Sequence, residues 1–180
     1  MYYHCSPTAG LTLLQPNAPK HFDKPSGVYL TTCLPMALLY GIRHFEYTYG
    51  YTKSEQIYYA EYFPNALETL YRGRSASLYL CRPGNVEHTK IPNEAVSYAP
   101  VEVVEERPIP DLLEALHEQA RQKAITIYTY DQLSDAFRRS IIEEETAEIK
   151  RRGLLNTPSS PMAQWMRSHY PESWQLAMRK

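Results

Sequence analysis

One histidine, two tyrosines and a group of glutamates have side chains that can form hydrogen bonds, stack on flat rings and stabilise positive charge. Tyr29 and Tyr40 lie eleven residues apart, and their flat faces can stack on a ring from both sides. His4 can hydrogen-bond a hydroxyl group and fix its orientation. A nearby carboxylate would stabilise positive charge that develops in a reaction. Taken singly, each residue has an ordinary structural explanation: a hydrogen-bonded histidine, a strand tyrosine and a helix-core tyrosine.

Alternating strands and helices must position these residues. Apolar alternation and helical spacing, bounded by proline and glycine, define the elements that we expect. The predicted strands are 2–5, 27–31, a pair within 44–59 that turns near Gly50, 77–81, 101–104 and 125–129. The predicted helices are 32–41 with Pro35 in its first turn, a short one after Pro64, 110–122, 131–152, 162–169 and 171–178. Residues 6–26, which contain four prolines, are expected to form a loop or short turns.

Three segments carry a resemblance to a known family. The first is Tyr3-His4-Cys5-Ser6, and the second is Gly27-Val28-Tyr29-Leu30-Thr31-Thr32, followed by Tyr40 in a helix. The third is a glutamate-rich strand region, 98–106. Together they resemble the ADP-ribosyltransferase superfamily, in particular its diphtheria-toxin and poly(ADP-ribose) polymerase-like branch with a His-Tyr-Glu signature. The resemblance covers about residues 1–130.

The resemblance implies that NAD is the substrate and that its nicotinamide–ribose bond is broken. That cleavage passes through an oxocarbenium-like state, as glycoside cleavage does. By the resemblance, Tyr29 and Tyr40 hold the nicotinamide ring, His4 holds a ribose, and the backbone at Cys5 contacts the nicotinamide amide. We predict that Glu102 is the catalytic carboxylate and takes the role of the family's glutamate, because it lies on the corresponding strand.

The chain differs from the family pattern at three positions. Cys5 replaces a glycine, Ala37 replaces a helical serine, and Pro100 stands where the family's catalytic glutamate is usually found. Glu102 lies on the same predicted strand face as Pro100 and is therefore the first substitute. The further candidates for the catalytic carboxylate are Glu94, Glu105 and Glu106. Loss of the expected glutamate favours the alternative that the protein is an inactive relative that binds a nucleotide or a protein partner, with the tyrosine-rich segment 44–62 as its binding region.

Composition narrows the function classes. The formal net charge is −1, which gives no general basic surface for nucleic acid. An enzyme that removes a 2′-phosphate from RNA with NAD is disfavoured, because no cluster of arginines lies near the signature residues. The three cysteines and six histidines lack metal-ligand spacing, so we expect no metal site. The absence of a leader-like start and of an apolar run of roughly 20 residues predicts a cytoplasmic protein without membrane association.

The predicted fold is α+β, with a split, mainly antiparallel sheet, flanking helices and a helical C-terminal extension. We expect an ADP-ribosyltransferase-like core over residues 1–130 and the helical extension over 131–180. Trp165 and Trp174 are expected to anchor this extension onto the domain itself, with a protein partner on the C-terminal helices as the alternative. The acceptor of ADP-ribose is left open among protein, nucleic acid and small molecules.

Overall fold

The computed structural model describes residues 1–17, 25–43 and 48–179. Part of the predicted loop 6–26 and residues 44–47 of the predicted strand pair lie outside these ranges. The strands are β1 (Tyr2–Ser6), β2 (Leu13–Leu14), β3 (Val28–Thr31), β4 (Tyr49–Tyr51), β5 (Ile57–Ala60), β6 (Ala76–Cys81), β7 (Glu87–His88), β8 (Glu94–Ser97), β9 (Val101–Ile109) and β10 (Thr126–Tyr128). The helices are α1 (Leu34–Leu39), α2 (Ala66–Tyr71), α3 (Leu112–Arg121), α4 (Asp135–Arg151), α5 (Pro161–His169) and α6 (Pro171–Met178), with short 3₁₀ turns at Tyr130–Gln132 and Leu154–Asn156.

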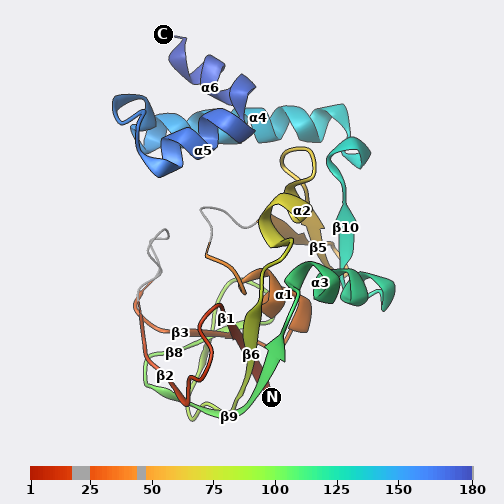
Figure 1. The fold of residues 1–180 in the computed structure, drawn as a ribbon, viewed down its shortest axis with the longest axis vertical. Helices are drawn as coiled ribbons and strands as arrows, with labels where there is room; N and C mark the ends of the chain where they lie inside the picture. Colours follow the sequence, from red (N-terminus) through yellow and green to blue (C-terminus); the bar gives the residue numbers. More distant parts are fainter. Residues whose placement is uncertain (18–24, 44–47, 180) are drawn as a thin grey trace. The chain divides into compact units, whose positions relative to one another are not determined.

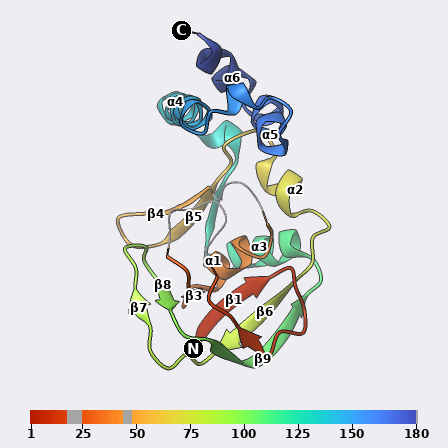
Figure 2. The ribbon, with the colours of Figure 1, turned by 90° about the vertical axis from the view of Figure 1, so that its left-hand side faces the viewer.

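Antiparallel pairing dominates the structure and confirms the predicted α+β class. Within the described ranges, seven strands form one sheet in the order β2-β9-β6-β1-β3-β8-β7, and a second sheet has the order β10-β5-β4. Figure 1 shows β3 and β8 running side by side, and Figure 2 shows β1, β6 and β9 as neighbours. Every registered pair in the larger sheet is antiparallel.

The register of β1, β6 and β9 determines which side chains share a face. His4 pairs with Tyr79, and Tyr79 pairs with Glu106. A bulge follows, because Leu80 is opposite Glu105 whereas Cys81 is opposite Val103. An extra residue in one strand reverses its alternation beyond the bulge.

The bulge has a direct consequence for Glu102. Val103 shares the face of Tyr79 and Cys81, and it packs with them in one apolar cluster. Glu102 therefore lies on the opposite face, away from the row that contains His4. It is exposed and pairs with Leu13 of the edge strand β2.

Helices α1 and α3 pack together beside β1. Pro35 occupies the first turn of α1, where its missing N–H costs no hydrogen bond. The helix predicted over 32–41 is shorter in the structure: it begins at Leu34, and its capping residue Cys33 makes no side-chain capping bond. A methyl group at Gly41 would lie 2.9 Å from the fully buried Leu112 and 3.0 Å from Cys5 Sγ. This contact requires a residue without a side chain, and it places the Cys5 thiol in the core.

The strands differ from the prediction most clearly at the turn after β4, at the end of β9 and at β8. Gly50 lies within β4, and the chain turns instead at Thr52–Gln56, where Glu55 has φ of 59°. Strand β9 extends to Ile109, well beyond the predicted end at Val104, because its polar residues pair with β6 along its whole length. Strand β8 was missing from the prediction, since a glutamate at its start conceals a strand in which every residue is buried.

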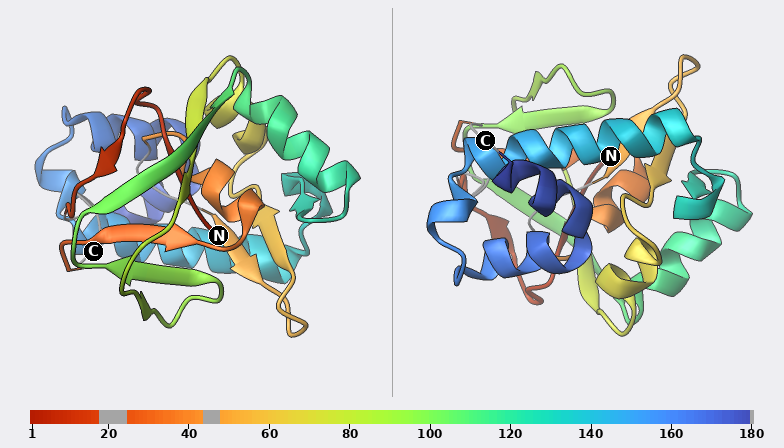
Figure 3. Two further views of the ribbon diagram at one scale, coloured as in Figure 1. Left: turned by 90° about the horizontal axis from the view of Figure 1, so that it is seen from below. Right: turned by 90° about the horizontal axis from the view of Figure 1, so that it is seen from above.

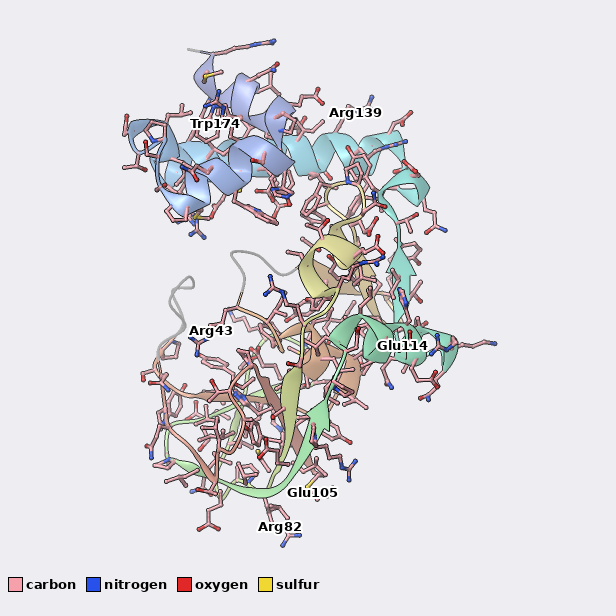
Figure 4. All side chains as sticks on the ribbon, viewed as in Figure 1. Arg43, Arg82, Glu105, Glu114, Arg139 and Trp174 are labelled. Atoms are coloured by element: carbon pink, nitrogen blue, oxygen red, sulfur yellow. The ribbon has the colours of Figure 1, made fainter. Side chains whose placement is uncertain are left out.

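The chain divides into two compact units, Met1–Tyr59 with Leu67–Ile127, and Ala60–Ala66 with Tyr128–Lys180. In the second unit α4 packs against α6, and α5 contacts α6, as Figure 3 shows. Trp174 of α6 is buried (Figure 4). Phe63 contacts two rings of α5, with its ring centroid 5.7 Å from that of Trp165 and 4.6 Å from that of His169.

Candidate functional site

Three neighbouring strands, β1, β3 and β8, carry His4, Tyr29 and Glu94. Strand β1 pairs with β3 at Tyr3 and Thr31, and β3 pairs with β8 along its length. In that register Thr31 lies opposite Glu94. Tyr29 and Glu94 share one face of the sheet, since Tyr29 is opposite Val96 and Thr31 is opposite Glu94. His4 lies on the other face, because its cross-strand partner Tyr79 packs with Val28 and Leu30.

Gly27 permits the close approach of the chain before β3 to β8. A methyl group at Gly27 would lie less than 3.0 Å from Val96 Cγ2, and Val96 is itself buried. Val96 is the cross-strand partner of Tyr29. The glycine of the Gly-Val-Tyr segment therefore has a steric function, which is to keep Tyr29 and β8 in register.

His4 makes a specific hydrogen bond to β3. Its Nδ1 lies 3.0 Å from the backbone oxygen of Tyr29. A carbonyl can only accept, so Nδ1 carries the proton and donates. Burial lowers the pKa of His4, which keeps the ring neutral and leaves Nε2 as an acceptor. A sugar hydroxyl is a group that Nε2 in this state can bind.

Cys5 offers its backbone rather than its thiol. The side chain is buried next to Gly41 and Leu112. Burial raises the pKa of the thiol to about 12, so the sulfur stays protonated and is a poor nucleophile.

The two signature tyrosines are both half-buried. The hydroxyl of Tyr29 donates to the backbone oxygen of Pro25 at 2.8 Å. Burial and the nearby charge of Glu94 both raise the pKa of Tyr29. Tyr40 ends α1 as its C-cap residue, and its hydroxyl lies 3.1 Å from that of Tyr49.

Glu94 is the carboxylate near Tyr29 and the two tyrosines of β4, Tyr49 and Tyr51. It begins β8 and is only 3% exposed. The hydroxyl of Thr89 donates to its Oε1 at 2.9 Å. Its charge acts on three tyrosines, since it contributes, after burial, to the raised pKa values of Tyr29, Tyr49 and Tyr51. We call Tyr29, Tyr40, Tyr49, Tyr51 and Glu94 the tyrosine–carboxylate cluster.

Glu102 does not join this cluster. Strands β6 and β1 separate β9 from β3, which puts Glu102 three strand spacings, roughly 14 Å, from the strand of Tyr29. It is exposed on the face opposite His4. The structure thus puts Tyr29 and Glu94 on adjacent strands and one face of the sheet. His4 lies on the neighbouring strand β1 with its side chain on the other face, and Glu102 lies on the more distant β9.

The two remaining glutamate candidates have structural partners on β9. Glu105 projects from β9 (Figure 4) and pairs with Arg107 at 2.6 Å. Glu106 accepts hydrogen bonds from the Gly10 N–H at 3.1 Å and from the Ser77 hydroxyl, and these bonds lower its pKa. The buried Tyr79 hydroxyl donates to the Thr8 carbonyl at 2.6 Å and lies 3.4 Å from Glu106. These hydrogen bonds hold the segment after β1, which contains Thr8 and Gly10, against strands β6 and β9.

Sequence reasoning overlooked Tyr49, Tyr51 and Asn93 as individual site residues. Tyr49 and Tyr51 share one face of β4, and the ring of Tyr49 meets those of Tyr40 and Tyr51 edge-on at 5.9 and 6.2 Å. The period-two spacing of these tyrosines was the available signal. Asn93 carried no comparable signal, because its position depends on a turn between β7 and β8.

Comparisons with family models, curated proteins and solved structures gave no match to this chain. Within residues 1–17, 25–43 and 48–179, no group of three or more histidine, cysteine, aspartate or glutamate side chains could hold a metal ion. No helix in these ranges has the length and apolar character needed to cross a membrane.

Proposed function

We propose that this protein cleaves the nicotinamide–ribose bond of NAD and transfers ADP-ribose to a nucleophilic acceptor. The observation that carries the proposal is the position of Glu94: a buried carboxylate on the strand next to Tyr29, whose charge acts on that signature tyrosine. The same strands present a neutral His4 that is oriented by a hydrogen bond to Tyr29. These residues support the proposal because each type of group suits one part of the reaction.

Each group has a defined task in the reaction. Tyr29 and Tyr40 stack on nicotinamide, and Nε2 of His4 accepts a hydrogen bond from a ribose hydroxyl. The bond from the ribose C1′ to the nicotinamide nitrogen breaks, and its electron pair leaves with neutral nicotinamide. Glu94 stabilises the positive charge left on the ribose and orients the acceptor, which attacks C1′ and gives up a proton.

Glu94 replaces Glu102 in this proposal because of position and environment. A carboxylate that is shielded from water stabilises nearby positive charge more strongly than an exposed one. Glu94 is buried at the strand next to Tyr29, whereas Glu102 is exposed three strands away. The two glutamates therefore form a matched pair for mutagenesis.

The test compares Glu94→Gln with Glu102→Gln in an assay of nicotinamide release from NAD. We expect Glu94→Gln to reduce kcat on the order of 10²–10³-fold, the typical effect of removing one electrostatic contact to the transition state. NAD affinity, measured by calorimetry, should change little. Glu102→Gln should retain the wild-type rate. Full activity of Glu94→Gln would refute the assignment of the carboxylate, and binding without release in the wild type would favour the non-enzymatic alternative.

A further inference from the structure

Tyr40 is held in place by a second tyrosine that the reaction itself does not use. The hydroxyl groups of Tyr40 and Tyr49 lie 3.1 Å apart, and one donates to the other. The two rings also meet edge-on, with centroids 5.9 Å apart and planes at 75°, a favoured arrangement for aromatic pairs. The orientation of the Tyr40 ring is therefore determined at its hydroxyl and along its edge.

Strand β4 directs Tyr49 towards Tyr40. Gly50 lies opposite Tyr58 of β5, and a methyl group at Gly50 would lie 2.5 Å from the Tyr58 hydroxyl. The Tyr58 side chain thus covers that face of β4 at Gly50. Tyr49 and Tyr51 point to the other face, because successive side chains of a strand alternate.

Tyr51 anchors Tyr49 from the opposite side. The rings of these two tyrosines meet at 83° with centroids 6.2 Å apart. The Tyr51 hydroxyl donates to the sulfur of Met36 in α1 at 3.3 Å, and it also has a side-chain hydrogen bond with Asn93. Asn93 precedes Glu94, and the Thr32 N–H donates to its backbone oxygen at 3.0 Å. A continuous set of contacts thus leads from Tyr40 to the residue before the buried carboxylate.

We propose that Tyr49 is a positioning residue for NAD, which acts by holding the ring of Tyr40 in its stacking orientation. The inference rests on the proposed function, since it assigns a task to a residue around the same site. A ring that is already ordered loses less conformational freedom when a ligand binds. Removing the hydroxyl of Tyr49 therefore weakens NAD binding through Tyr40 and leaves the groups that act on the ribose in place.

The experiment measures NAD affinity and nicotinamide release for Tyr49→Phe. Loss of one hydrogen bond should weaken NAD binding about three- to tenfold, with kcat within about twofold of wild type. Tyr128→Phe is the control, because this half-exposed ring on β10 lies outside the tyrosine–carboxylate cluster and its loss of a hydroxyl should leave both values unchanged.

Tyr40→Phe removes the same hydrogen bond from its other end and completes a double-mutant cycle. We expect the two single variants to have similar NAD affinities and Tyr49→Phe to have no added effect in the Tyr40→Phe background. Unchanged affinity in Tyr49→Phe, or full additivity of the two substitutions, overturns the positioning role. NAD binding with nicotinamide release by the wild type upholds the proposed function in that case. Failure of the wild type to bind NAD overturns both.

Discussion

Replacing Gly27 by alanine tests whether the glycine before β3 sets the spacing of the site. The new methyl group would overlap Val96 Cγ2, a short and buried side chain that has little room to move. Overpacking of this kind costs about 1–3 kcal/mol of unfolding free energy. Because Val96 faces Tyr29 across β3 and β8, the shift should also displace Glu94 and lower the rate of nicotinamide release.

A second substitution turns this clash into a quantitative test. Val96→Ala alone should cost about 1–3 kcal/mol through lost burial and a cavity. In the double variant Gly27→Ala/Val96→Ala, the new methyl group occupies the space that valine vacates. The double variant should therefore be more stable than the sum of the two single effects by about 0.5–3 kcal/mol.

Urea unfolding followed by far-ultraviolet circular dichroism measures these free energies. Gly84→Ala is the control, because no atom lies within 4 Å of a methyl group placed there, and it should change stability by less than about 0.5 kcal/mol. The reasoning is refuted if Gly27→Ala is as stable as Gly84→Ala, or if the two substitutions in the double variant are additive.

Three further predictions address the stacking role of Tyr29, the hydrogen bonds of Glu106 and the packing of the C-terminal unit. Tyr29→Ala should weaken NAD binding in calorimetry about two- to twelvefold, since stacking contributes about 0.5–1.5 kcal/mol beyond burial; equal affinity would contradict the stacking role. The pKa of Glu106 lies below its ordinary 4.5 in the folded state, so its stabilising effect is present above pH 4.5 and is lost as the pH falls through the lowered pKa; the acid side of the stability curve should flatten in Glu106→Gln, and an unchanged curve would count against these hydrogen bonds. Phe63→Ala should destabilise the C-terminal unit by about 3–5 kcal/mol, because Phe63 is buried against the ring of Trp165; tryptophan fluorescence reports this unfolding, and a loss below about 1 kcal/mol would contradict the packing.

Regular elements whose ends are marked by proline or glycine could be predicted from the sequence. The helix predicted at 171–178 matches α6, and the strand predicted at 77–81 matches all but the first residue of β6. In the first case a proline marks the start of the helix, and in the second an apolar run ends at a Pro-Gly turn. The turn after β4 was misplaced, because Gly50 signals a turn in sequence whereas the structure needs it as a strand residue under Tyr58.

The candidate site could be predicted only in part, because its carboxylate depends on tertiary packing. His4, Tyr29 and Tyr40 stand out by residue type and spacing, and the strand order then brings Glu94 next to Tyr29. A glutamate at the start of a buried strand gives no periodic signal. The bulge in β9 likewise has no sequence signature, yet it is what turns Glu102 away from the face of His4.

Calorimetric titration of the purified wild-type protein with NAD, followed by an assay of nicotinamide release on the same sample, tests the central claim most directly. If the tyrosine–carboxylate cluster is an NAD site, NAD should bind saturably and nicotinamide should be released, with water or an added nucleophile as the acceptor. Absence of binding at millimolar NAD would contradict the assignment of this cluster as an NAD site.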